Sequence, residues 1–109
     1  MENFVHVKSL DELKQAVGHE QHYWLLKHSS TCPVSAAAWK EYSEYASLHP
    51  HQLFLYLVVQ EDRSLSTAVE EITGIRHASP QLFHFASQKV DWHASHNKIT
   101  NKAMNEFNA

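Results

Sequence analysis

The residue best suited to chemistry in this chain is Cys32, its only cysteine. An apolar run that is typical of a strand, residues 23–26, precedes it, and a run rich in alanine, residues 36–39, favours a helix after it. This pattern places the sulfur on a turn at the start of a helix. Unpaired N–H groups and the positive end of the helix dipole there favour a thiolate, the reactive form of cysteine. We therefore expect Cys32 to be a catalytic nucleophile.

The residues around Cys32 define an active-site turn made of Thr31, Pro33, Val34 and Ser35. Proline suits the first turn of a helix because its missing N–H would be unpaired there anyway. A dithiol redox protein would carry its second cysteine at the position of Ser35. The Ser35 hydroxyl has two interpretations: a donor to the thiolate, or an ordinary first-turn serine. Because serine cannot form a disulfide, we expect a one-thiol enzyme that takes its second thiol from solution.

A second candidate segment is Ser79-Pro80, directly before a predicted strand. Cis bonds are a small minority of X-Pro bonds, but in the context of a thioredoxin-like fold, which the predicted order of elements indicates, we expect one here. It would turn the backbone of Ser79 toward an extended substrate beside the sulfur. His77 lies in the same loop. His77, Lys27 and His28 either add positive potential near the sulfur or occupy ordinary surface positions.

Alternating apolar patterns predict the elements that position these segments. We expect strands at 4–7, 23–27, 53–59, 81–85 and 89–93, with a polar hairpin turn at 86–88. Ser9 and Glu12 form a capping-box pattern for a helix that ends at Gly18, and Thr100 caps a C-terminal helix. A middle helix carries the apolar stripe Leu65, Val69 and Ile72 and ends before Gly74.

The predicted order is β-α-β-α-β-α-β-β-α. It indicates an α/β protein with a thioredoxin-like fold, in which helices flank both faces of a central mixed β-sheet. A chain of 109 residues is expected to be one domain, 1–109.

Composition limits the function classes. The net charge is −3, no basic run indicates nucleic acid, and no apolar stretch approaches the roughly 20 residues of a membrane span. The N-terminus lacks a signal-peptide pattern, and a single cysteine suits a reducing cytoplasm. Ten histidines include pairs with loose metal-ligand spacing, but a structural zinc site usually needs several thiolates. We therefore expect no metal.

Several segments together resemble one family, the bacillithiol-system YtxJ family of monothiol bacilliredoxins. They occur in the expected order over nearly the whole chain: Lys27-His28-Ser29, Thr31-Cys32-Pro33-Val34-Ser35, His77-Ala78-Ser79-Pro80-Gln81, Trp92-His93-Ala94-Ser95-His96 and Ile99-Thr100. One departure is the polar Ser87-Gln88 turn, where a glycine-containing hairpin is expected.

The resemblance implies a thioredoxin-like fold and cytoplasmic thiol-disulfide exchange. The implied partners are client proteins with a cysteine capped by bacillithiol, a low-molecular-weight thiol. Cys32 would be the nucleophile, Pro33 and Ser35 would shape its turn, and Ser79-Pro80 would face it. The resemblance implies no bound cofactor, and bacillithiol or another thiol reductant would act as co-substrate.

Two other classes remain open from the sequence. Monothiol glutaredoxins, which carry iron–sulfur clusters, also place a serine three residues after their cysteine, but glycine follows that cysteine, where this chain has Pro33. The other class is a thioredoxin-like binding module without enzymatic activity, in which Cys32 would have an ordinary pKa.

Overall fold

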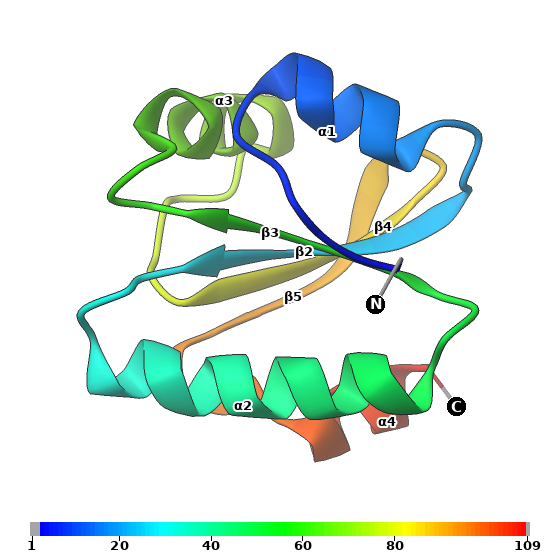
Figure 1. Cartoon of the computed structure of the whole chain (residues 1–109), viewed down its shortest axis with the longest axis vertical. Coiled ribbons are helices and arrows are strands. Elements are labelled where there is room, and N and C mark those ends of the chain that lie inside the picture. Colours follow the sequence, from blue (N-terminus) through cyan, green and yellow to red (C-terminus); the bar gives the residue numbers. More distant parts are fainter. Residues whose placement is uncertain (1–2, 109) are drawn as a thin grey trace.

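The computed structural model describes residues 3–108, in which a five-stranded sheet lies between two layers of helices (Figure 1). The helices α1 and α3 cover one face, and α2 and α4 cover the other. The elements follow the predicted order with one addition, the short 3₁₀ helix η1. They are β1 (Phe4–His6), α1 (Leu10–Val17), β2 (His22–His28), α2 (Pro33–Leu48), β3 (Leu53–Val58), α3 (Arg63–Thr73), β4 (Gln81–Ala86), β5 (Lys89–Ser95), η1 (His96–Lys98) and α4 (Asn101–Phe107).

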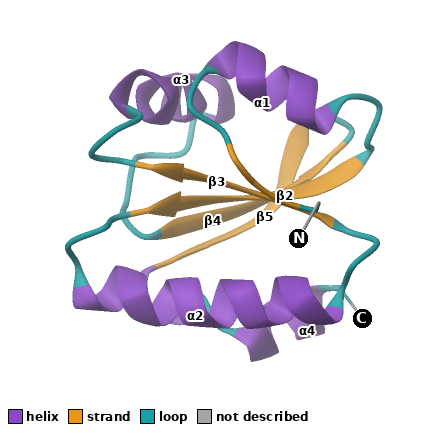
Figure 2. Ribbon diagram, viewed as in Figure 1, coloured by secondary structure: helices purple, strands orange, loops and turns teal. Residues whose placement is uncertain are grey.

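The sheet is mixed, with the strand order β1-β3-β2-β4-β5. The strands β1, β3 and β2 run parallel, whereas β4 is antiparallel to both β2 and β5. In register, His28 at the end of β2 lies opposite Val58 at the end of β3, and Lys27 lies opposite Gln81 at the start of β4. The loops that follow β2 and β3 and the loop that precedes β4 therefore meet at one edge of the sheet (Figure 2).

Alternation along β2 divides its side chains between the two layers. Tyr23 and Leu25 pack in the cluster under α1 and α3, whereas Trp24 and Leu26 pack in the cluster under α2 and α4. All four are buried, as the apolar run of a central strand predicts. The next residue in this alternation, Lys27, falls on the α3 side.

Local sequence signals fix several helix ends as expected. Ser9 Oγ accepts a hydrogen bond from the Glu12 N–H at 3.1 Å, and Thr100 Oγ1 accepts one from Ala103. The capping box is only half formed, because the Glu12 carboxylate accepts from the N–H of Lys8 instead of Ser9. At the C-terminal helix Ile99 and Met104, on either side of the Thr100 cap, are both buried, which is the arrangement of a hydrophobic staple.

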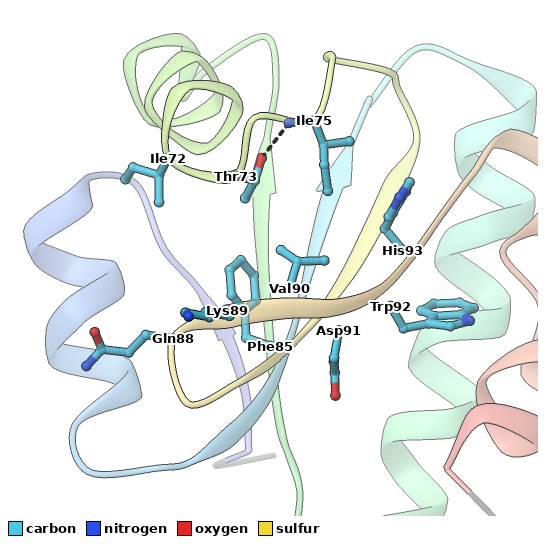
Figure 3. A pocket seen from close by; sticks show the side chains of 10 residues that line it. All are labelled: Ile72, Thr73, Ile75, Phe85, Gln88, Lys89, Val90, Asp91, Trp92 and His93. Carbon is cyan, nitrogen blue, oxygen red and sulfur yellow. Dashed lines mark hydrogen bonds between the residues drawn. The ribbon is translucent and has the colours of Figure 1, made fainter.

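One detail of the predicted helices is wrong. Ile72 was expected in the apolar stripe of α3 but is 61% exposed, because it lies in the last turn at the rim of a cavity (Figure 3). Gly74 adopts the expected left-handed conformation, with φ 69° and ψ 11°. Gly18 instead has φ 55° and ψ −120°, a conformation that is equally difficult for a residue with a Cβ.

Candidate active site

Cys32 is the N-cap residue of α2, and Pro33 is its first helical residue. The thiol is partly exposed, and among the described residues no side-chain hydrogen bond caps the helix. The backbone N–H of Ser35, followed by that of Val34, lowers the pKa of Cys32 because both stabilise the thiolate. Partial burial opposes this effect, and the Ser35 hydroxyl adds a smaller lowering of the pKa. The start of the helix thus favours the ionised sulfur, as the sequence predicts.

Ser35 itself is fully buried. Its Oγ accepts a hydrogen bond of 3.3 Å from the N–H of Ser29, at the other end of the turn. Both interpretations of this residue therefore apply, because its main chain and hydroxyl act on the sulfur while its hydroxyl also closes the turn.

The turn is tied to the loop after β3 by Gln60, a residue that the sequence analysis did not identify. The Gln60 side-chain N–H donates to Ser29 Oγ at 2.7 Å and to Thr31 Oγ1 at 3.2 Å, and its carbonyl accepts from the Ser30 N–H. Pro33 and Val34 are exposed beside the sulfur. The exposed residues Thr31, Pro33 and Val34 thus form a surface that a partner can contact. Gln60 and Ser29 hold this turn in place through hydrogen bonds.

The peptide bond Ser79-Pro80 is cis, as predicted. Pro80 is buried, and its carbonyl accepts a hydrogen bond from the N–H of His96. The adjacent Gln81 holds the loop through two further hydrogen bonds, accepting from the Ala78 N–H and donating to the Arg76 carbonyl. The register of β2 and β4 brings this loop to the sheet edge where the Cys32 turn begins.

Lys27 does not occupy the surface position considered for it, because its side chain is fully buried. Its Nζ donates to the Ser66 carbonyl on α3 at 3.0 Å and lies 3.1 Å from His77 Nδ1. Burial lowers the pKa of Lys27, and the Glu70 carboxylate partly offsets that lowering. A lysine at the end of an apolar strand gives no local sign of burial, and only the sheet alternation places it under α3.

His77 and His28 favour their neutral forms at this site. Burial lowers the pKa of His77 first, and the charge of Lys27 lowers it further. The backbone N–H of His77, and not its ring, donates to the Glu70 carboxylate at 2.7 Å. Burial also lowers the pKa of His28, whose ring lies 4.6 Å from that of Trp39. Neither imidazole therefore supplies the positive potential that was considered for the sulfur.

A cavity of about 460 Å³ lies between the end of α3 and β5 (Figure 3). Its lining includes Thr73, Val90 and Trp92, and none of the predicted site residues. Across residues 3–108, no group of three or more His, Cys, Asp or Glu side chains is arranged to hold a metal ion. No helix in this range is long and apolar enough to cross a membrane.

Comparison with known proteins assigns this arrangement to a family. The family model for monothiol bacilliredoxin BrxC matches residues 5–104. The chain belongs to this family. The result agrees with the resemblance carried by the motifs around Cys32 and Pro80, and with a bacilliredoxin site that has one thiol at the start of a helix.

Solved structures show the same fold. A protein assigned provisionally as an oxidoreductase with a thioredoxin fold matches with a TM-score of 0.91 and 28% identity, over 98% of this chain and 95% of that one. Mitochondrial thioredoxin 3 from Saccharomyces cerevisiae matches with a TM-score of 0.76 and 10% identity, over 95% and 92%. A thioredoxin variant from Halobacterium salinarum matches with a TM-score of 0.77 and 15% identity, over 97% and 88%. The chain therefore has the thioredoxin-like fold expected from its element order.

Proposed function

We propose that this bacilliredoxin is a monothiol thiol-disulfide oxidoreductase that removes bacillithiol from S-bacillithiolated protein cysteines in the cytoplasm. One observation carries the proposal: in a chain of the monothiol bacilliredoxin family, the single cysteine is the N-cap residue of a helix, where backbone N–H groups favour the thiolate. The family match favours this exchange reaction over the iron–sulfur carrier and the inactive binding module.

In the first step the Cys32 thiolate attacks the bacillithiol sulfur of the client's mixed disulfide. A bond forms between Cys32 Sγ and that sulfur, the original S–S bond breaks, and the client cysteine leaves as a thiolate that takes a proton from water. The client thiol is reduced and Cys32 becomes S-bacillithiolated. Residues Pro33 and Val34, exposed beside the sulfur, would meet the client, and the backbone before Pro80 would pair with its extended segment.

In the second step a thiolate of bacillithiol, or another thiol reductant, attacks the small-thiol sulfur of the Cys32 adduct. A small-molecule disulfide forms when bacillithiol is the reductant, and Cys32 leaves as a thiolate. The N–H groups that lower the pKa of Cys32 favour this departure, because a thiol of lower pKa is the better leaving group. No bound cofactor takes part in either step.

The test is the rate of client thiol release from a protein bacillithiolated on one cysteine. We expect Cys32→Ser to abolish release, because an alcohol does not displace a thiolate from a disulfide at neutral pH. Ser35→Ala is the matched control on the same turn and should keep much of the rate, since the backbone N–H groups remain.

An unchanged release rate in Cys32→Ser would overturn the proposal. Circular dichroism of both variants establishes that the fold is retained, so that a loss of rate reports on the sulfur.

A further inference from the structure

A second cavity, of about 580 Å³, lies beside the Cys32 turn on the α3 side of the sheet. Three loops and α3 contribute side chains to its wall, among them Ser29, Gln60, Arg63, Thr67, His77 and Ser79. A volume of this size is within the range of small-ligand sites, about 300–1,000 Å³. It includes two of the predicted substrate-loop residues, whereas the cavity of Figure 3 includes none of the predicted site residues.

The wall of this cavity is joined directly to the active-site turn. Ser29 supplies both its N–H to Ser35 Oγ and its own Oγ to the Gln60 amide, and the same amide reaches Thr31 Oγ1 beside Cys32. The cavity wall and the Cys32 turn therefore share Ser29 and Gln60, which places the cavity next to the turn that carries the sulfur.

The charges around the cavity favour an anionic group. Arg63 is exposed in its wall and makes no ion pair within residues 3–108. The Nζ of Lys27 is buried against Ser66 and His77, two residues of the same wall. The one carboxylate in the wall, Glu70, already accepts the His77 N–H at 2.7 Å. The Arg63 guanidinium is therefore the charged group of the wall that is free to pair with a ligand.

Within the described part of the chain, two features near this cavity have no side-chain hydrogen-bond partner: the Ser79 hydroxyl and the first turn of α3. The Ser79 Oγ is buried and has no hydrogen-bond partner among residues 3–108. The first turn of α3, which begins at Arg63, has no side-chain cap, because the Asp62 carboxylate instead accepts from the Val58 N–H and contacts His6. Buried polar groups are usually paired, and a helix start favours anions.

We propose that this cavity binds the carboxylate-bearing part of the small thiol whose sulfur is exchanged at Cys32. The inference rests on the proposed function, since it needs a small thiol as the species carried by Cys32. Arg63 pairs with a carboxylate of the thiol beside the uncapped first turn of α3. The small thiol is thereby recognised by charge, separately from the protein client that meets the exposed turn.

The test compares small disulfides that differ in charge but react at the same sulfur. In each reaction the Cys32 thiolate forms a mixed disulfide with one half of the probe, and the other half leaves as a thiolate. The probes are 3,3′-dithiodipropionate, which carries carboxylates, the uncharged 2-hydroxyethyl disulfide, and bacillithiol disulfide. The variants are Arg63→Gln and, as a matched control, Arg76→Gln, which alters the other exposed arginine, one outside the cavity wall.

We expect Arg63→Gln to slow the dithiodipropionate and bacillithiol disulfide reactions about tenfold, the loss of one charge-assisted hydrogen bond. The hydroxyethyl disulfide rate should be unchanged, and Arg76→Gln should match the wild type with all three probes. Equal rates for Arg63→Gln and wild type, or an equal slowing with the uncharged probe, would overturn the cavity assignment and leave the proposed function standing. A wild-type chain that does not react with bacillithiol disulfide, while it reacts with the other probes, would overturn both.

Discussion

The pKa of Cys32 is lowered by main-chain N–H groups and not by a neighbouring cation. The N–H groups of Ser35 and Val34 lower its pKa, whereas the two nearby imidazoles favour neutrality and Lys27 is engaged with Ser66 and His77. A side-chain substitution that preserves the turn does not remove these main-chain N–H donors. The activation of the sulfur should therefore survive substitutions around it.

This arrangement predicts the pH dependence of Cys32. Because its pKa is lowered, the thiolate persists at pH values where an ordinary thiol, with a pKa of about 8.5, is protonated. The rate of alkylation by iodoacetamide should therefore have its midpoint at a lower pH than that of free cysteine measured in parallel, and Ser35→Ala should move that midpoint upward only slightly. A midpoint at or above the value of free cysteine would contradict the assignment of the helix start as the activating group.

Lys27 is the residue whose role differs most from its appearance in the sequence. It looked like a candidate surface cation, but it is a fully buried group that links β2 to α3 and to the loop of His77. Burial makes its charged form unfavourable in the folded state.

The lowered pKa of Lys27 predicts how stability changes with pH. Between the lowered folded value and the unfolded value of about 10.4, the unfolded chain binds more protons, so stability rises with pH. The free energy of unfolding of wild type relative to Lys27→Met should therefore increase across this window, by about 1.4 kcal/mol for each unit by which the pKa is depressed. Urea unfolding from pH 7 to 10 measures this difference.

Lys40→Met, which alters an exposed lysine of α2, is the control and should show no such slope. A flat difference between wild type and Lys27→Met over the whole range would mean that Lys27 titrates like a free lysine.

At the scale of elements, local sequence patterns were sufficient to predict the helices and strands, but not the side-chain hydrogen bonds that connect one loop to another. Residues adjacent in the sequence were enough to predict the helix caps at Ser9 and Thr100 and the strand before Cys32. Gln60 and Gln81, which hold the active-site turn and the loop before β4, act through contacts that depend on the folded arrangement. No spacing pattern distinguishes such a glutamine from one in solvent, so these supports could not be predicted.

The β4–β5 hairpin has a turn that strains its residues. Ser87 and Gln88 have φ values of 51° and 70°, a region that favours glycine. Gln88→Gly should stabilise the protein by about 1 kcal/mol, because it removes the steric cost of a Cβ in this conformation. Urea unfolding should show the gain, and Gln88→Ala, which keeps the Cβ, should not; a loss of stability with glycine would contradict the strained-turn account.

At the scale of the whole molecule, the sequence was enough to predict the fold class and the cis peptide bond before β4. The element order fixed the mixed sheet, and the parallel strands required their ends to share an edge with the Cys32 turn. The burial of Lys27 and the cavity beside Arg63 could not be predicted, because both arise where α3 packs on β2 and meets three loops. Both features depend on the packing of α3 against the sheet, which no short stretch of sequence specifies.

The central claim is that Cys32 takes the small thiol itself from a client protein. Mass spectrometry of the intact chain after one turnover with a singly bacillithiolated client tests this claim directly. We predict that the chain gains the mass of one bacillithiol less two hydrogens, in equal amount to the client thiol released, and that Cys32→Ser gains nothing. A disulfide-linked complex of chain and client with free bacillithiol, or client release without any adduct on the chain, would contradict the account.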